Sequence, residues 1–311
     1  MFDSENCVYH YTSAARCAED ILPSMSLRMG SFAGLNDPRE AKTWPFRFYS
    51  RDGSGFHRDL FNEATEIVTQ QSLMLSCSRN NPEGDRHDQL RLGFAHPRMW
   101  AQYANGHRGV CLALDIAALD TAVRETAAAR PVFCGPVDYL QSGHAPIGPE
   151  GDPYGIVYLE DIESRGLQAM IDSLVMQYHR HLFFTKHLDW RDEWEFRWVV
   201  RSKDGQPLFV PIATALRAVF VGQDCCSDDF GRLLTLCRSA GIPVHRVYWH
   251  GWAISVFGDP LEDEASDPLS LNGISFSTKI PCSSVFTQGL GHDGRVRTVE
   301  IRSSGDVVPL D

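Results

Sequence analysis

The segment GVCLALDIAALDTAVRETAAARPVFCGPVDYL, residues 109–140, contains a complete strand–helix–strand unit. Residues 109–114 form an apolar run of strand length, which predicts a buried strand. Residues 115–129 are rich in alanine, leucine and charged side chains, which favour a helix. Residues 132–140 are rich in β-branched and aromatic side chains and predict a second strand. The elements on both sides of this unit then determine the fold class.

Strands outnumber helices along the rest of the chain, and the helices are irregularly spaced. The pattern predicts strands at residues 7–12, 26–30, 73–78, 195–200, 216–221 and 244–248. It predicts helices at residues 14–21, 57–71, 164–184 and 227–240, with Ser13 as a cap and Pro23 as a stop for the first, and a short helical turn at 99–104. We therefore expect an α+β fold with mixed, largely antiparallel sheets and flanking helices, and not a regular parallel α/β fold.

The length and punctuation of the chain predict one core and one appendage. A chain of 311 residues suits one large domain or two small ones, and residues 1–257 predict a single α+β core domain. Residues 258–273 are acidic and contain proline, so we expect an exposed connector, and residues 274–311 alternate weakly and predict a C-terminal β appendage. Residues 79–91 and 141–155 are rich in turn-forming residues and predict loops.

The composition excludes several classes of protein. Hydrophobic residues make up 43% of the chain, which excludes wholesale disorder. The 29 basic and 40 acidic residues give a net charge of −11, which disfavours a broad nucleic-acid-binding face. No apolar stretch is long enough to span a membrane, and the first residues lack a signal peptide, so we expect a cytoplasmic location. Nine cysteines without paired spacing indicate reduced thiols.

Polar and aromatic side chains gather beside the predicted strands, most densely in residues 186–197, KHLDWRDEWEFR. In an extended chain Glu193 and Glu195 would point to the same face, because successive strand side chains alternate. Like charges so placed repel each other unless a cation or a substrate lies between them. The alternative is that Arg191 and Arg197 neutralise a solvated strand end.

Four motifs resemble those of a widespread bacterial family of uncharacterised proteins, known as a domain of unknown function. They are N-D-P-x-E at residues 36–40, S-x-S at 76–78, M-W-x-x-Y-x-x-x-H-x-G-V-C at 99–111 and K-x-x-x-W-x-x-E-x-E-x-R at 186–197. The resemblance covers about residues 8–250. The two longer motifs are specific, but the family implies no established activity.

A second resemblance, to the ADP-ribosyltransferase superfamily, implies a fold and a mechanism. His10 lies on the first predicted strand, Ser76-Cys77-Ser78 resembles the middle strand, and Glu193-Trp194-Glu195 resembles the Glu-x-Glu pair of that superfamily. The resemblance implies an ADP-ribosyltransferase-like fold, with NAD as the substrate and a protein or nucleic acid as the acceptor. It also implies a bacterial toxin or defence effector.

The same resemblance implies a role for each site residue. Glu195 would stabilise the oxocarbenium character that develops on the ribose, and Glu193 would orient or deprotonate the acceptor. The NAD-binding residues would be His10, at the adenosine ribose; Thr12, at the backbone or NAD; Ser78, orienting Glu195; and Trp100 or Tyr103, stacked on nicotinamide. In that superfamily a first-strand His accompanies a middle Tyr, whereas a serine strand accompanies an Arg, so either Ser78 or Tyr103 is the middle residue.

Two other function classes stay open. A ligand-sensing or partner-binding module would use the tryptophans Trp190, Trp194, Trp198, Trp249 and Trp252. A metal-dependent nuclease or phosphoesterase would use Glu40, Asp189, Glu193 and Glu195. We expect no metal site, because the spacing of Cys225, Cys226, Cys237, His245 and His250 matches no compact zinc pattern. The sequence also lacks the glycine-rich loops of ATP and dinucleotide cradles.

Overall fold

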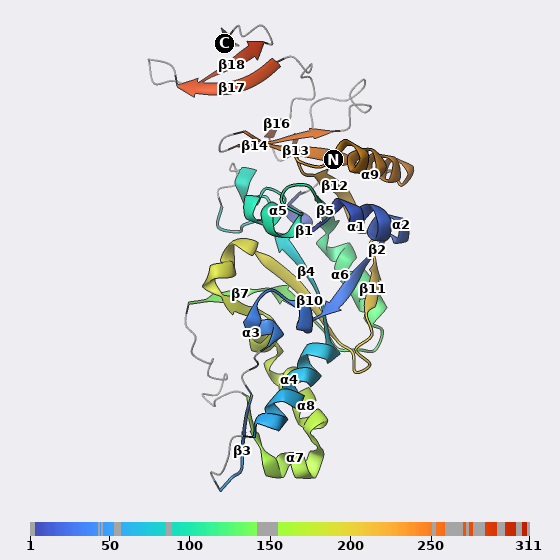
Figure 1. The fold of residues 1–311 in the computed structure, drawn as a ribbon, viewed down its shortest axis with the longest axis vertical. Coiled ribbons are helices and arrows are strands. Elements are labelled where there is room, and N and C mark those ends of the chain that lie inside the picture. The colour runs from blue at the N-terminus through green and yellow to red at the C-terminus, as the bar shows by residue number, and fades with distance from the viewer. Residues whose placement is uncertain are drawn as a thin grey trace.

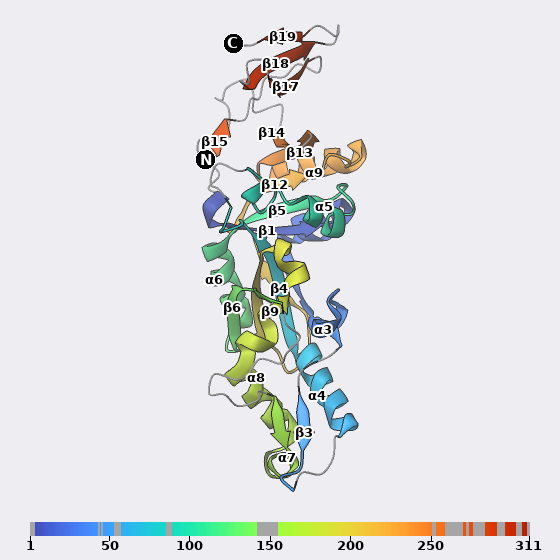
Figure 2. The same cartoon turned by 90° about the vertical axis from the view of Figure 1, so that its left-hand side faces the viewer.

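The chain folds as an α+β protein with a mixed, mostly antiparallel sheet and flanking helices, as the sequence predicted (Figures 1 and 2). The computed structural model describes residues 4–42, 44, 46–52, 57–84, 89–141, 155–250 and 253–258, and the strand segments 270–271, 274–275, 284–290, 296–302 and 307–309. In both views α4, α7 and α8 lie on one side of β1 and β5 along the long axis, and α9, β13 and β14 lie on the other.

The described residues form a 10-stranded main sheet in the order β11-β2-β4-β1-β5-β12-β13-β14, with β10 against β4 and β6 against β10. Within it β12 and β13 are parallel, and the other pairs are antiparallel. The strands are β1 (Cys7–Thr12), β2 (Ser26–Ser31), β4 (Ser72–Arg79), β5 (Val110–Asp115), β6 (Val132–Pro136), β10 (Glu195–Arg201), β11 (Leu208–Pro211), β12 (Leu216–Val221), β13 (Val244–His250) and β14 (Ala253–Gly258).

The helices flank the sheet, and α4, α7 and α8 lie at the lower end of the molecule in Figure 1. They are α1 (Ala14–Arg16), α2 (Leu22–Ser24), α3 (Pro38–Ala41), α4 (Arg58–Gln71), α5 (Pro97–Tyr103), α6 (Ile116–Ala127), α7 (Leu159–Arg165), α8 (Leu167–Phe183) and α9 (Ser227–Ser239). A π-helical segment, Cys17–Ile21, joins α1 to α2, and 3₁₀ turns cover Ser4–Asn6, Phe32–Gly34, Gln89–Arg91 and Leu188–Glu193. Two short parallel pairs complete the described core: β3 (Arg47–Tyr49) with β8 (Ile156–Tyr158), and β7 (Asp138–Leu140) with β9 (Thr185–His187).

Four predicted elements differ from the structure. The strand predicted at residues 132–140 is two strands, β6 in the main sheet and β7 paired with β9. Ser13 caps the first helix, but Pro23 does not stop it, because proline is tolerated in the first turn of α2; the helix ends instead at Met25, in a left-handed conformation. The predicted helix at 164–184 is two helices, since Gly166 has a φ of +81° between α7 and α8. The predicted loop at 79–91 contains a 3₁₀ turn with Arg91 buried.

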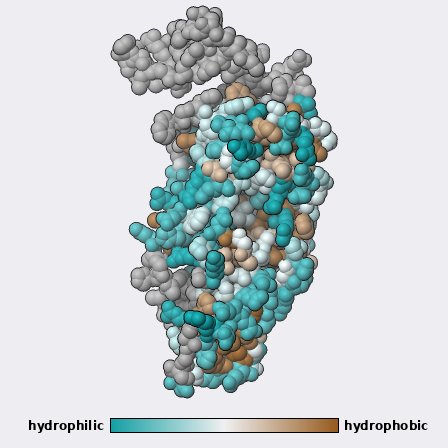
Figure 3. All heavy atoms as spheres, in the orientation of Figure 1, coloured by the Kyte–Doolittle hydropathy of each residue, from teal (hydrophilic) through white to brown (hydrophobic). Residues whose placement is uncertain are grey.

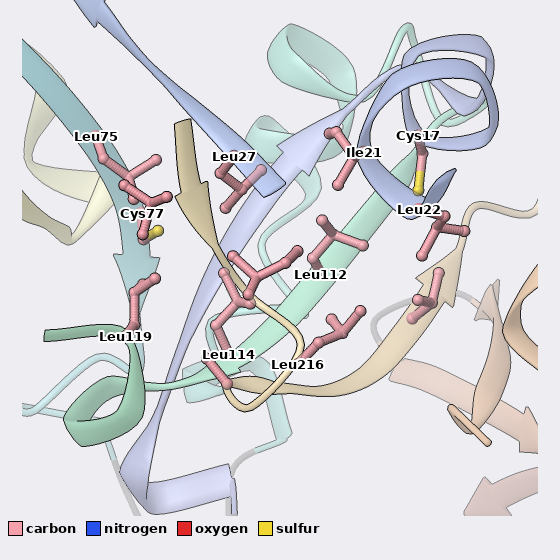
Figure 4. Packing of buried hydrophobic residues seen from close by; sticks show 14 of the residues in the cluster. Cys17, Ile21, Leu22, Leu27, Leu75, Cys77, Leu112, Leu114, Leu119 and Leu216 are labelled. Atoms are coloured by element: carbon pink, nitrogen blue, oxygen red, sulfur yellow. The ribbon is translucent and has the colours of Figure 1, made fainter. Parts of the chain in front are cut away.

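The two faces of the main sheet are chemically different. On one face Leu75 and Cys77 of β4 pack with Leu27, Leu112 and other apolar side chains into the largest buried cluster (Figure 4). The alternate residues of β4 and β10 point to the other face, where Ser76, Ser78, Glu195 and Arg197 are polar and Met74 and Val199 join a separate apolar cluster. The outer surface seen in Figure 3 is mainly hydrophilic, with hydrophobic residues in small groups.

The sheet forks beside β4. One edge of β4 pairs with β10 along seven positions. On its other edge β4 pairs with β1 only at Val8–Arg79 and Tyr9–Ser78, and with β2 only at Gly30–Met74 and Ser31–Leu73. Within the described residues, positions 75–77 of β4 pair with neither strand on this edge. Strands β1 and β2 therefore diverge from β4 and leave a space between them.

Several predictions fall wholly or partly outside the described residues. The loop predicted at 141–155 lies outside them except for residues 141 and 155, and so does most of the connector predicted at 258–273. Beyond it β15 (Ser270–Leu271) pairs with β16 (Ile274–Ser275), and β17 (Ser284–Leu290), β18 (Val296–Arg302) and β19 (Val307–Pro309) form an antiparallel sheet. The domain boundaries stay a prediction. Among the described helices, none has the length and apolar character needed to cross a bilayer.

Candidate functional site

A pocket of about 300 Å³ lies where the sheet forks. His10 of β1, Ser76 and Ser78 of β4, and Glu195 of β10 line it from three neighbouring strands. The pocket is also lined by four residues outside these strands: Tyr103 of α5, Glu193 of the 3₁₀ turn, Glu40 of α3 and Lys186 of β9. The structure thus brings together five of the seven predicted site residues: His10, Ser78, Tyr103, Glu193 and Glu195.

Five buried charges form the floor of the pocket. The Lys186 ammonium lies between the two predicted carboxylates, 2.7 Å from Glu193 Oε2 and 3.1 Å from Glu195 Oε2. Arg197 Nη2 lies 2.6 Å from Glu195 Oε2 and 3.1 Å from Glu40 Oε2, and its Nη1 contacts Glu40 Oε1. When all five groups are ionised, three carboxylates and two cations leave one net negative charge. We name these residues the ion cluster.

The two carboxylates reach one pocket through a turn, not through strand alternation. Glu193 ends the 3₁₀ turn Leu188–Glu193, Trp194 has a left-handed φ of +46°, and Glu195 begins β10. The interpretation of a solvated strand end is wrong, because Glu193, Glu195 and Arg197 are all buried. Arg191 is exposed and lies 3.6 Å from Asp192.

The ion cluster changes the proton affinities of its members. Burial alone would raise the pKa of Glu195, but the charges of Arg197 and Lys186 outweigh burial and hold this pKa at about 2. Burial raises the pKa of Glu40 despite its contact with Arg197. The pKa of Lys186 is raised, because the surrounding carboxylates, Glu195 first, outweigh its burial. Glu195 is therefore ionised and Lys186 protonated at neutral pH.

The two serines of β4 have different partners. Ser76 Oγ donates a 2.5 Å hydrogen bond to Glu195 Oε1, whereas Ser78 Oγ donates a 2.7 Å bond to the Glu193 carbonyl. The predicted role of Ser78 in orienting Glu195 is therefore wrong, and Ser76 has that role. Glu195 faces Ser78 in the strand ladder, but its side chain leans along β10 toward Arg197, which faces Ser76.

His10 and Tyr103 are oriented by specific hydrogen bonds. His10 Nδ1 lies 3.2 Å from the carbonyl oxygen of Ser76, a position of β4 that the fork leaves without a strand partner on that edge. A carbonyl only accepts, so Nδ1 carries the proton, and burial lowers the pKa of His10 and keeps it neutral. Tyr103 Oη donates a 2.6 Å bond to Glu193 Oε1.

Two predicted residues lie outside the pocket. Trp100 is fully buried, donates its Nε1–H to the Phe94 carbonyl at 2.7 Å, and packs edge-on against Tyr11. The prediction that Trp100 stacks on a ligand is therefore wrong, since this indole belongs to the core. Thr12 is buried and lines the adjoining groove instead of the pocket.

The residue sets of the two alternative function classes are only partly at the pocket: Glu40, Glu193 and Glu195 line it, but the tryptophans and Asp189 do not. Trp190, Trp194, Trp198 and Trp249 do not line the pocket, and Trp252 lies outside the described residues. Asp189 is exposed and contacts His187, away from Glu40, Glu193 and Glu195. Within the part of the chain that the structure describes, no group of three His, Cys, Asp or Glu residues could hold a metal ion.

Sequence reasoning missed Lys186, Ser76 and Tyr139 as functional residues. Tyr139 Oη accepts a 2.9 Å hydrogen bond from the backbone N–H of Glu195, which holds the start of β10. Lys186 opens the fourth motif, so its place in that motif was the one available signal. Ser76 and Ser78 lie on the same strand face, and spacing alone could not separate their roles.

The fold and site define an α+β protein with a buried ion cluster in the fork of its sheet. Residues 99–198 match a family described as protein of unknown function (DUF2971), and this stretch contains both of the longer motifs. This match supports the resemblance to an uncharacterised domain-of-unknown-function family that the motifs predicted, over this part of the chain. No curated protein and no solved structure matches the chain.

Proposed function

We propose that the chain is an NAD-dependent ADP-ribosyltransferase with its active site at the ion cluster. One observation carries this proposal: His10, Ser76, Tyr103, Glu193 and Glu195, from separate parts of the chain, line a single pocket. Convergence of an oriented carboxylate, a neutral histidine and a second carboxylate in one small space is what a candidate active site requires.

Glu195 would act at the ribose. Cleavage of the bond between C1′ and nicotinamide sends the bonding pair to the ring nitrogen and leaves oxocarbenium character on the sugar, as in glycoside hydrolysis. A carboxylate with a pKa of about 2 stays ionised, and Ser76 and Arg197 hold it in one orientation. A preorganised negative charge stabilises the developing positive charge without reorganising.

Glu193 would act at the acceptor. The acceptor nucleophile forms the new bond to C1′ and must lose a proton, and Glu193 is the second carboxylate at the pocket. Tyr103 and Lys186 each donate to one of its oxygens, which fixes its direction. The single net negative charge of the ion cluster favours the cationic nicotinamide ring of NAD.

A divalent-metal nuclease is less well supported than a transferase. The Lys186 ammonium occupies the position between Glu193 and Glu195 where a metal ion would have to lie. The cluster therefore carries its own cation and has its carboxylates paired.

A ligand-sensing module is the second candidate. Both oxygens of Glu195 already have partners, Ser76 and Arg197 at Oε1, and Arg197 and Lys186 at Oε2. This saturation favours binding without turnover. The same assay separates the two functions, because a sensor would be stabilised by NAD or a fragment of it and leave the molecule intact.

We propose that the transferase acts in the cytoplasm of a bacterium as a toxin or defence effector on a protein or nucleic acid. The cysteines of the described residues are all free thiols, which supports a reducing compartment. The net charge of −11 gives a protein acceptor the better support.

Nicotinamide release tests the proposal. Purified protein is incubated with NAD and bacterial extract, and free nicotinamide is measured by chromatography. We expect Glu195→Gln to abolish release, and Glu125→Gln, at an exposed position of α6, to leave it unchanged. Circular dichroism and the melting temperature confirm that both variants are folded. Intact NAD after long incubation of the native protein with extracts and fractionated acceptors contradicts the proposal.

A further inference from the structure

The pocket adjoins a larger groove of about 1310 Å³. His10, Tyr11, Arg28, Gly34 and Tyr103 line both spaces, so these side chains lie between them. The groove occupies the space between the diverging strands β1 and β2, with the α1–α2 segment that connects them along its wall. Its position follows from the fork, because neither strand follows β4 past its short pairing.

An exposed aromatic side chain lies in this groove. Phe209 is 59% exposed and lies on β11, which ends the order of the main sheet. An exposed hydrophobic side chain on an edge strand invites aggregation and is commonly avoided. The alternate residues of the same two strands, Leu27, Met29 and Val210, are buried and already pack the core on the opposite face. Phe209 therefore presents an open aromatic face to the groove.

A cation without an ion-pair partner among the described residues lies opposite that aromatic residue. Arg28 is directly opposite Phe209 in the β2–β11 ladder, and both side chains point away from the apolar core. Among the described residues Arg28 forms no ion pair or side-chain hydrogen bond, and its guanidinium does not stack on Phe209. Arg16 lines the same groove, also without an ion pair to a described residue. Glu19 and Asp20 line it too, and Glu19 lies 3.6 Å from Arg232.

We propose that the groove binds a nucleoside 5′-phosphate, with the base stacked on Phe209 and the phosphate held by Arg28. An aromatic face takes a flat heterocycle of any identity, and a free guanidinium matches the two oxygens of a phosphate. The proposal rests on the proposed function in one respect: the pocket at the ion cluster would hold the other end of a dinucleotide. A pocket of about 300 Å³ is at the lower limit of ligand sites, and a dinucleotide extends beyond it.

The nucleoside phosphate has two possible sources: the AMP half of NAD, or a nucleotide of the acceptor. Both have the same chemistry in the groove. If the groove binds the AMP half of NAD, then NAD and AMP cannot bind together. If it binds an acceptor nucleotide, they can, so a competition experiment identifies the source.

Binding of AMP, measured by titration calorimetry on the full chain, tests the proposal. We expect Phe209→Ala and Arg28→Ala each to weaken AMP binding by about tenfold, because one stacked base or one charged contact is worth about 1.4 kcal/mol or more. Adenosine lacks the phosphate, so Arg28→Ala should leave adenosine binding unchanged while Phe209→Ala weakens it. Met176→Ala and Arg165→Ala are matched controls, because Met176 is 52% exposed and both lie outside the groove.

Each outcome is decisive. Lack of AMP binding, or equal binding by the wild type and both groove variants, overturns the proposal. Displacement of AMP by NAD assigns the groove to the AMP half of NAD, and simultaneous binding assigns it to an acceptor nucleotide. Glu195→Gln should still bind AMP. If AMP binds and both groove variants weaken its binding, but the wild type releases no nicotinamide, the groove is a nucleoside-phosphate site and the transferase function is contradicted.

Discussion

The two faces of the β4–β10 pair use the same backbone for different purposes. On one face Leu73, Leu75 and Cys77 of β4 meet Trp198 and Val200 of β10 in the main apolar cluster. On the other face, the side chains of Ser76, Glu195 and Arg197 form hydrogen bonds and ion pairs around the pocket. Because side chains alternate along a strand, one face can pack the main core while the part of the other face near Ser76 and Glu195 lines the pocket; farther along that face, Met74 and Val199 pack into a separate apolar cluster.

The difference shows why the ion cluster tolerates burial. Removing charges from water is unfavourable unless they are paired and hydrogen-bonded. The apolar face gains free energy from each buried side chain, whereas the ionic face gains little on balance. Its groups are held in place by the rigid pair of strands behind them. A substitution on the ionic face should therefore lower the free energy of unfolding by leaving a buried charge unpaired. A substitution on the apolar face should lower it by leaving a cavity.

The largest effect is expected from Arg197→Met. The change leaves Glu40 without its cation and removes one of the two cations beside Glu195, both buried. Breaking a buried ion pair on one side destabilises a protein by about 3–5 kcal/mol. Urea unfolding measures the free energy, and Arg191→Met is the control, since Arg191 is exposed and should change it by less than about 0.5 kcal/mol. Equal stability of the two variants would contradict the structural role of the ion cluster.

Leu73→Ala tests the apolar face of the same strand. Leu73 is buried in the main apolar cluster and does not line the pocket, so the substitution removes side-chain volume without touching any polar group. We expect a loss of about 3 kcal/mol in the free energy of unfolding. NAD cleavage per folded molecule should stay within about twofold of wild type, measured at a temperature where the variant is fully folded. A selective loss of cleavage would mean that the two faces are not separable.

The pH dependence of stability gives a smaller effect. The pKa of Glu195 in the folded protein, about 2, is below its ordinary value of 4.5, so its ionised form stabilises the fold at higher pH. This stabilisation is present above about pH 4.5 and is lost as the pH falls toward 2. The raised pKa of Glu40 acts in the opposite direction, so the wild type is compared with Glu195→Gln by urea unfolding between pH 6 and 3. The wild type should lose more stability; parallel curves would contradict the ionised state of Glu195.

The sequence predicted the strands of this face well, because β4 and β10 are continuous apolar or alternating runs with clear ends. Motifs and resemblance also pointed to five of the residues that line the pocket, His10, Ser78, Tyr103, Glu193 and Glu195, but not to Lys186 or to the role of Ser76. The sequence could not predict the left-handed turn at Trp194 or the fork that leaves Ser76 without a strand partner on one edge. Both depend on the pairing of distant strands, which single-sequence periodicity does not report.

Ser76→Ala and Ser78→Ala should give the smallest change in stability and the most specific change in activity. Ser76 donates to a carboxylate, so its loss should cost about 2 kcal/mol, and Ser78 donates to a neutral carbonyl, so its loss should cost about 1 kcal/mol. The substitutions are identical, two residues apart on one strand, and lie on the same face. If Ser76 orients Glu195, Ser76→Ala should reduce nicotinamide release at least tenfold while Ser78→Ala leaves it within about threefold. The opposite order would return the orienting role to Ser78. Because both variants lose the same atom from the same strand, a shared loss of stability cannot explain a difference in turnover, and the comparison reports on the direction of the Glu195 side chain alone.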